Sequence, residues 1–160
     1  MMNDVLIVVD VQKGLNEIPD FNHFLTRINH RIMSYRTVGK QVIFVQHNDK
    51  DMPLNSKSWE FADQLDITNA DSVVSKTYPD SFLETNLESI LRDNEYTNFE
   101  ICGAQTEYCI DTTIRVGFHL GYQISVQHDL VGTLNNEIMT AEQINKHHEH
   151  IWQGRFAKVF

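Results

Sequence analysis

The most constraining feature of this sequence is an uninterrupted apolar run, V-L-I-V-V, at positions 5–9. No polar residue alternates with the apolar ones, so both faces of the segment are expected to be buried. This pattern is typical of a strand in a parallel sheet whose two faces are covered by helices. We therefore expect an α/β fold.

The remainder of the chain alternates between strand-like and helix-like patterns. Short apolar runs predict further strands at 41–46, 72–75, 98–102, 122–127 and 155–160. Helical spacing of apolar residues predicts helices at 21–38, 81–94, 106–120 and 140–152. This alternation predicts βαβ units with right-handed crossovers, and hence a three-layer sandwich around a mostly parallel, six-stranded sheet. We expect one domain spanning residues 1–160, because that length is near the usual domain size and no linker interrupts it.

Composition and charge exclude several classes of function. The net charge of −9 makes nucleic acid and anionic membranes poor partners. Two cysteines cannot form the disulfide framework of a small secreted domain. The N-terminus passes from M-M-N-D directly into a strand, without the pattern of a secretory signal, and no apolar run approaches the length of a membrane span. We therefore expect a cytoplasmic protein.

The segment I-C-G-A-Q-T-E-Y-C at positions 101–109 carries the clearest chemical signal. It predicts the end of a strand, a turn on Gly103 and the start of a helix near Thr106. Cys109 would lie about one turn inside that helix, where free backbone N–H groups and the helix dipole favour a thiolate. The same turn leaves N–H groups that can face an oxyanion. A buried, purely structural thiol is the alternative for Cys109, and it is what we expect of Cys102 within the strand.

Two other reactive residues occupy equivalent positions, since Asp10 follows the first predicted strand and Lys76 the third. The carboxyl ends of parallel strands meet at one edge of the sheet, where open α/β sheets bind ligands, so Asp10, Lys76 and Cys109 are expected to meet there. Cys109 would then be the nucleophile and Asp10 the group that accepts and returns its proton. Lys76 would keep Asp10 ionised and favour the thiolate. For Asp10 alone, a solvated loop residue or a local cap is the alternative.

The three residues stand in the contexts V-V-D-V-Q at 8–12, V-V-S-K at 73–76 and C-G-A-Q-T-E-Y-C at 102–109. In this order and spacing they resemble the Asp–Lys–Cys triad of the isochorismatase-like cysteine hydrolases. That family includes nicotinamidases, N-carbamoylsarcosine amidases and streptothricin hydrolases. The resemblance runs from Val5 past Asp129, and it implies a parallel sheet of about six strands in a Rossmann-like order. It also implies a cis peptide bond between Ala104 and Gln105, with the N–H groups of Gln105 and Cys109 forming an oxyanion hole.

The sequence departs from the metal-dependent members of the family. Nicotinamidases bind a divalent metal through an Asp-x-His pair after the second strand, whereas positions 46–49 here are Q-H-N-D. We therefore expect neither a catalytic metal nor an organic cofactor. The histidines at 147, 148 and 150 resemble a metal-binding tract, but they lie on a polar predicted helix and are expected to be solvated.

These features predict a metal-independent cysteine hydrolase that cleaves the C–N amide bond of a small molecule through a thioester. The long segment 48–69 is expected to shape the pocket, with a neighbouring subunit of a homodimer or higher oligomer completing it. Two alternatives remain: a vinyl-ether hydrolase of the isochorismatase type, with Asp10 as acid and Cys109 dispensable, and a non-catalytic thiol-sensing or binding protein of the same fold. The candidate pocket residues are Gln12, His47, Trp59, Tyr78 and Phe82.

Overall fold

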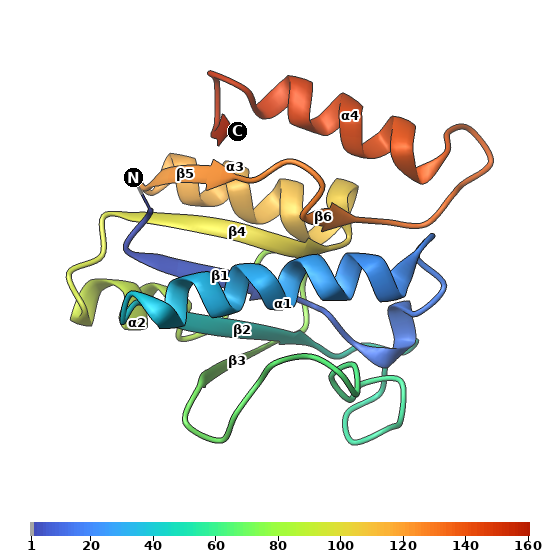
Figure 1. Cartoon of the computed structure of the whole chain (residues 1–160), viewed down its shortest axis with the longest axis horizontal. Helices are drawn as coiled ribbons and strands as arrows, with labels where there is room; N and C mark the ends of the chain where they lie inside the picture. Colours follow the sequence, from blue (N-terminus) through green and yellow to red (C-terminus); the bar gives the residue numbers. More distant parts are fainter. Residues whose placement is uncertain (1) are drawn as a thin grey trace.

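Strand β1, Val5–Val9, lies inside the sheet, with β2 on one side and β4 on the other, in agreement with its apolar run. The computed structural model describes residues 2–160, and Figure 1 shows its sheet with the helices packed around it. The strand order is β3-β2-β1-β4-β5-β7, β6 pairs with β4, and all of these pairings are parallel. The other strands are β2 Gln41–His47, β3 Ser72–Lys76, β4 Asn98–Ala104, β5 Gln123–Val126, β6 Val131–Gly132 and β7 Lys158–Val159.

The prediction of an α/β fold with a parallel sheet is confirmed, and all six predicted strands are present. The sheet has a seventh strand, β6, which the sequence pattern does not reveal. Because β6 contains only two residues, it is too short to show a strand periodicity. Its partners are Gly103 and Ala104, so it extends the sheet next to the turn that precedes Cys109.

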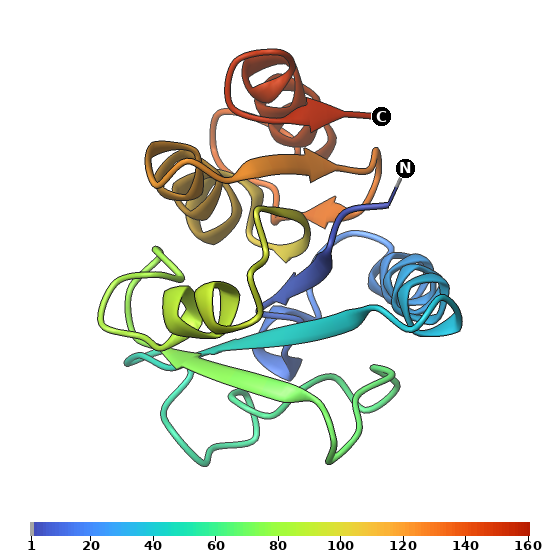
Figure 2. The ribbon, with the colours of Figure 1, turned by 90° about the vertical axis from the view of Figure 1, so that its left-hand side faces the viewer.

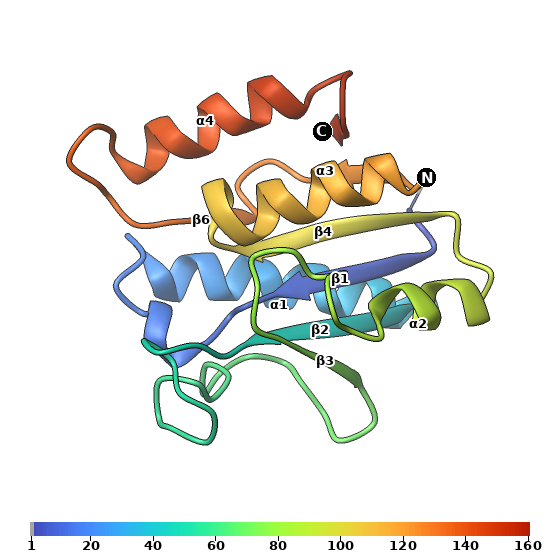
Figure 3. The same ribbon diagram turned by 180° about the vertical axis from the view of Figure 1, so that it is seen from behind.

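The helices form layers on both sides of the sheet. Helix α1, Phe21–Thr37, covers one face, and α2, Leu87–Asp93, and α3, Asp111–His119, cover the other (Figures 2 and 3). Helix α4, Ala141–Trp152, lies beyond β5 and contacts β6 and β7 (Figure 1). Among residues 2–160, no helix combines the length and the apolar character needed to cross a lipid bilayer.

Residues of β1 alternate between two hydrophobic cores. Val5, Ile7 and Val9 pack on the side of α2 and α3, whereas Leu6 and Val8 pack on the side of α1. All five residues are at most 1% exposed. A strand that contributes to both cores cannot contain a solvated polar face, which is why its sequence is apolar throughout.

The helix predicted over 81–94 is shorter than its pattern, because α2 begins only at Leu87. Residues 81–86 form bends and turns instead. Two local features account for the difference: Asp80 accepts from the Phe82 N–H at 2.8 Å, and Glu84 has a left-handed backbone with φ of 55°, which an α-helix cannot contain. Polar side chains that bind nearby backbone groups compete with regular helix formation.

The carboxyl ends of the central strands share one edge of the sheet. Register pairs Val9 with both Val45 and Gly103, and it pairs His47 with Lys76. Asp10 after β1, Lys76 at the end of β3 and the turn after β4 therefore lie at the same level. The segment after β2 returns to this edge and contacts the short 3-10 helix Lys13–Leu15. There the Lys13 N–H donates to the Glu60 carbonyl at 2.9 Å. The edge is thus the place where the predicted site residues can meet.

Candidate active site

Asp10 follows β1 in a left-handed backbone conformation, with φ of 52°. This conformation is uncommon for residues other than glycine. The carboxylate is almost completely buried, and its Oδ2 lies 2.8 Å from Lys76 Nζ. The other oxygen, Oδ1, is buried and has no hydrogen-bond partner among residues 2–160. A buried acceptor without a partner is costly, and at a catalytic centre it is suited to receive a proton.

Lys76 is the last residue of β3, and its side chain is completely buried. Because β2 separates β3 from β1, only a long side chain can reach from Lys76 to Asp10. Its Nζ lies 2.8 Å from Asp10 Oδ2, 3.2 Å from Cys109 Sγ and 2.9 Å from His47 Nδ1. An ammonium group has three N–H donors, so these three acceptors use all of its hydrogen-bonding capacity.

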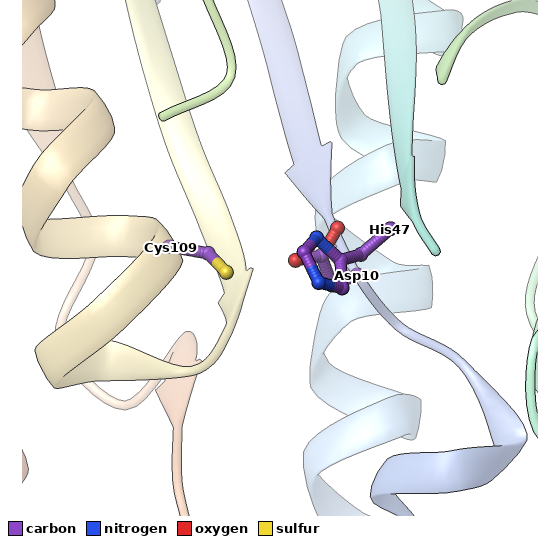
Figure 4. A group of neighbouring side chains, drawn as sticks. All are labelled: Asp10, His47 and Cys109. Carbon is purple, nitrogen blue, oxygen red and sulfur yellow. The ribbon is translucent and has the colours of Figure 1, made fainter. Parts of the chain in front are cut away.

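Cys109 lies in a turn of π-helix, Thr106–Ile110, which leads into α3. The Ile110 N–H donates to the Gln105 carbonyl at 3.1 Å, five residues back, which is the π-helical spacing. Figure 4 shows the sulfur directed from this turn towards Asp10 and His47. The helix start predicted near Thr106 is therefore correct in position, but it is a wider turn than an α-helix.

The ionisation state of Cys109 differs from the sequence-based expectation. Burial and then the Asp10 carboxylate raise the pKa of Cys109 to about 12, although Lys76 acts in the opposite direction. The helix start and Lys76 favour the thiolate, whereas burial, which the sequence pattern does not show, favours the neutral thiol and outweighs them. At neutral pH the structure pairs a neutral thiol with the Asp10–Lys76 ion pair. Cys102 is also a free thiol, completely buried, and its pKa is raised well above the usual value by burial.

The turn before Cys109 depends on an unusual backbone. The peptide bond between Ala104 and Gln105 is cis, as the family resemblance implies. Gly103 has φ of 115°, and a Cβ atom at this position would lie 2.0 Å from the Val9 carbonyl oxygen. Only glycine can therefore occupy the position. The N–H groups of Tyr108 and Ile110 donate to the Gln105 carbonyl at 3.2 and 3.1 Å and so hold the turn in place.

A cavity of about 290 Å³ opens beside these groups. Its volume lies near the lower end for small-molecule sites. A larger hollow of about 550 Å³ lies elsewhere, near the start of α1, but its lining contains no cysteine or histidine. The chemically relevant cavity is therefore the smaller one, and its lining residues are Asp10, Leu15, His47, Asp49, Met52, Thr77, Pro79, Gln105, Tyr108 and Cys109.

Of the five candidate pocket residues, only His47 lines this cavity. Gln12 is completely buried, and its side chain donates to the carbonyls of His47 and Trp59 at 2.9 and 2.7 Å and accepts from the His47 N–H at 2.8 Å. Gln12 therefore ties the segment after β2 to β1, and neither Gln12 nor Trp59 belongs to the cavity lining, contrary to expectation. Their positions after a strand end and in the long segment did not distinguish a structural role from an exposed one.

The other two candidates are also corrected. Phe82 stacks on Tyr122, with ring centroids 6.0 Å apart, and contacts Phe99 in the core under α2 and α3. Tyr78 is 42% exposed and lies outside the cavity lining, although its neighbours Thr77 and Pro79 belong to it. Sequence reasoning missed several lining residues, namely Leu15, Asp49, Met52, Thr77, Pro79 and Tyr108. Most of them are close in sequence to one of the three reactive residues, and this closeness was the signal that could have identified them.

His47 contacts both the lysine and a second carboxylate. Because an ammonium group can only donate, His47 Nδ1 must accept from Lys76 and cannot carry a proton. The ring proton is therefore on Nε2, which lies 3.0 Å from Asp49 Oδ2 and donates to it. His47 is thus a neutral imidazole that connects Lys76 with Asp49.

Asp10, His47 and Cys109 have the chemistry of metal ligands, and their ligand atoms lie within 4.8 Å of one another. The Lys76 ammonium, however, is within hydrogen-bonding distance of all three. A divalent cation at the centre of the cluster would occupy the position of this ammonium, and the two positive charges would repel each other. Asp10, His47 and Cys109 therefore do not form a suitable metal site while the charged Lys76 lies among them.

Comparison with known proteins identifies relatives over nearly the whole chain. A family model for the isochorismatase domain matches residues 4–150. The secreted isochorismatase effector Isc1 of Verticillium dahliae is 28% identical over 152 residues, which cover 90% of this chain and 80% of that protein. Streptothricin hydrolase of Streptomyces noursei is 29% identical over 136 residues, and the match covers 80% of this chain and 54% of that enzyme. This chain thus spans about half the length of the streptothricin hydrolase.

The fold comparison agrees with the sequence comparison. The crystal structure of an isochorismatase family protein superimposes with a TM-score of 0.93 and 38% sequence identity. The superposition covers 98% of this chain and 96% of the other. The arrangement of strands and helices described above is therefore that of these proteins.

Proposed function

Because this chain belongs to the isochorismatase family and is a hydrolase of that family, we propose that it cleaves the C–N bond of a small amide through a thioester on Cys109. One observation carries the proposal: Lys76 Nζ contacts Asp10 Oδ2 and Cys109 Sγ simultaneously, at the wall of a cavity. A nucleophile, an acid–base group and a fixed positive charge are thereby held together without an intervening solvent layer.

The first half of the reaction forms the acyl-enzyme. Asp10 Oδ1 accepts the Cys109 thiol proton while the sulfur attacks the amide carbonyl carbon. The oxyanion of the tetrahedral intermediate accepts hydrogen bonds from the N–H groups of Gln105 and Cys109. When the intermediate collapses, the C–N bond breaks, the Asp10 carboxylic acid protonates the leaving nitrogen, and a thioester remains on Cys109.

The second half of the reaction returns the enzyme to its resting state. Asp10 removes a proton from a water molecule, whose oxygen attacks the thioester carbonyl. The C–S bond then breaks, the product leaves as a carboxylic acid, and Asp10 returns the proton to the Cys109 sulfur. Lys76 carries its positive charge through both halves and stabilises whichever partner, carboxylate or thiolate, is negative.

A neutral resting thiol suits this sequence of steps. Because the pKa of Cys109 is raised to about 12, the sulfur does not carry a charge until a substrate is bound beside Asp10. Proton transfer and attack are then coupled, as expected for general-base catalysis. We propose that neither a metal ion nor an organic cofactor takes part, since Lys76 supplies the positive charge of the site.

The acyl-enzyme can be detected directly. We expect the protein, mixed with a panel of small primary and secondary amides and quenched in acid within milliseconds to seconds, to gain the mass of the acyl group at Cys109. Hydroxylamine should remove that mass, because it cleaves thioesters at neutral pH and leaves amides intact. The measurement is intact mass spectrometry followed by peptide mapping. A substrate that is turned over with no adduct at Cys109 under any quench time would contradict the thioester.

We also propose that the protein acts as a homodimer in the cytoplasm, where thiols stay reduced. The support for assembly is exposed apolar surface on the Cys109 helix and the 48–69 segment: Tyr108 is 54% exposed at the cavity, Leu54 is 57% exposed, and Phe118 at the far end of α3 is 50% exposed. We expect light scattering to give about twice the chain mass of 18.6 kDa at micromolar concentration. A monomer under these conditions would contradict the dimer and leave the proposed chemistry unaffected.

A further inference from the structure

The lining of the active-site cavity contains no arginine and no lysine. The lysine behind it, Lys76, has no exposed side-chain surface, and its charge is directed to Asp10, His47 and Cys109. An anionic group on a substrate would therefore find no free cation in the lining of the cavity.

The cavity does contain a second carboxylate, Asp49, whose side chain is 38% exposed. Its Oδ1 accepts from the N–H groups of Asp51 and Met52 at 2.8 and 2.9 Å, and its Oδ2 accepts from His47 at 3.0 Å. All three donors are neutral, because His47 holds its single proton on Nε2. The negative charge of Asp49 is thus oriented by hydrogen bonds but is not neutralised by a cation in contact with it.

The environment of Asp49 keeps it ionised. Burial raises its pKa, but the hydrogen bonds from Met52, His47 and Asp51 outweigh this effect, and the net result is a lowered pKa. Asp10 and Lys76 form an ion pair, so their charges cancel at a distance. Asp49 is therefore the carboxylate of the cavity lining that no lysine or arginine within residues 2–160 pairs with. The charge of the whole chain, −9, has the same sign and reinforces the field at the entrance.

We propose that the cavity selects uncharged or cationic small amides and rejects anionic ones, with Asp49 as the residue that determines this preference. The inference deepens the proposed function, because it states the substrate class for the same site. Leu15, Met52 and Pro79 supply the apolar part of the wall, so the expected substrate combines an apolar body with a neutral or positively charged group that faces Asp49.

Charge-selective labelling of Cys109 tests the preference without any knowledge of the substrate. Aminoethyl methanethiosulfonate is a cation and sulfonatoethyl methanethiosulfonate is an anion of similar size, and each forms a mixed disulfide with a thiol and releases methanesulfinate. Rates at Cys109, read by peptide mapping, are divided by the rates of the same reagents with N-acetylcysteine. We expect the cation to react roughly tenfold faster than the anion after this correction, which corresponds to one charge acting over several ångströms in a partly solvated site.

Two variants assign the effect to its source. Asp49→Asn should reduce the preference to about threefold or less, since it removes the charge while its side-chain oxygen can still accept from the Met52 N–H. Asp51→Asn is the matched control, because it removes the same charge two residues away, from a side chain outside the cavity lining, and the preference should persist. In the unmodified protein, 1 M salt should also shrink the preference, because it screens exposed charges.

The result that would overturn the proposal is equal labelling by both reagents, a preference that salt does not change, or a preference that Asp51→Asn reduces as much as Asp49→Asn does. The assay measures access and charge and does not measure turnover. Equal labelling would therefore leave the thioester chemistry standing, and the absence of an acyl adduct would leave the charge preference standing.

Discussion

Replacement of Cys109 by alanine is expected to lower amide turnover by at least about 10³-fold. The physical reason is that Asp10 and Lys76 alone supply no nucleophile that can form a covalent intermediate. The measurement is kcat/KM on the amide that the unmodified enzyme hydrolyses fastest. Cys102→Ala provides the matched control, since Cys102 is buried in β4 and does not line the cavity, and we expect the turnover of this variant to remain within a few-fold of the unmodified enzyme.

The same variant separates the proposed function from its alternatives. A vinyl-ether hydrolase that uses Asp10 as its acid would retain activity in Cys109→Ala, so undiminished turnover of an enol ether would identify that reaction. A protein that turns over neither class of substrate, but whose Cys109 reacts with electrophiles, would instead be a thiol-sensing or binding protein. Full amide turnover by Cys109→Ala would exclude the thioester mechanism.

Replacement of Asp10 by asparagine is expected to change turnover and thiol reactivity in opposite directions. Turnover should fall by roughly 10²–10⁴-fold, because the acceptor and donor of the catalytic proton is lost. Alkylation of Cys109 by iodoacetamide should become faster, because the negative charge of Asp10 is one of the causes that raise the pKa of the thiol. Peptide mapping after timed alkylation at pH 8 measures this rate, and slower labelling of Asp10→Asn would contradict the assigned electrostatics.

The pH dependence of labelling supplies the control for this argument. A thiol whose pKa is raised to about 12 is neutral at pH 7. As long as the pH stays below that pKa, each increase of one pH unit raises the thiolate fraction about tenfold. We therefore expect the labelling rate of Cys109 to climb from pH 7 to pH 10 without a plateau. Cys102 should react more slowly throughout, because it has no exposed surface. A plateau near neutral pH would instead indicate a resting thiolate and would contradict the raised pKa of Cys109.

The fold and the identity of the central residues could be deduced from the sequence because both depend on local pattern. An apolar run such as Val5–Val9 must be buried on both sides wherever it lies, and helical spacing identifies the elements that cover it. In a parallel sheet, the residues after the strands share one edge whatever the details of packing. Asp10, Lys76 and Cys109 were therefore predictable as neighbours from their positions alone.

The wall of the cavity was not predictable in the same way. Whether an aromatic side chain such as Phe82 packs into the core or faces a ligand depends on the neighbours that long-range contacts bring to it, here Phe99 and Tyr122. Gln12 was equally ambiguous, because its hydrogen bonds to the segment after β2 join residues far apart in the sequence. Local pattern carries no information on such contacts.

The electrostatics of the site depend on the folded arrangement as well. From the sequence one can read which ionisable residues are present and at which edge of the sheet they emerge. The fold decided that Lys76 donates to three partners at once, that Cys109 is buried enough to stay protonated, and that Asp49 retains an unneutralised charge in the cavity. The reason is that a pKa and a hydrogen-bond partner depend on burial and on separations of a few ångströms, which exist only once the chain has folded.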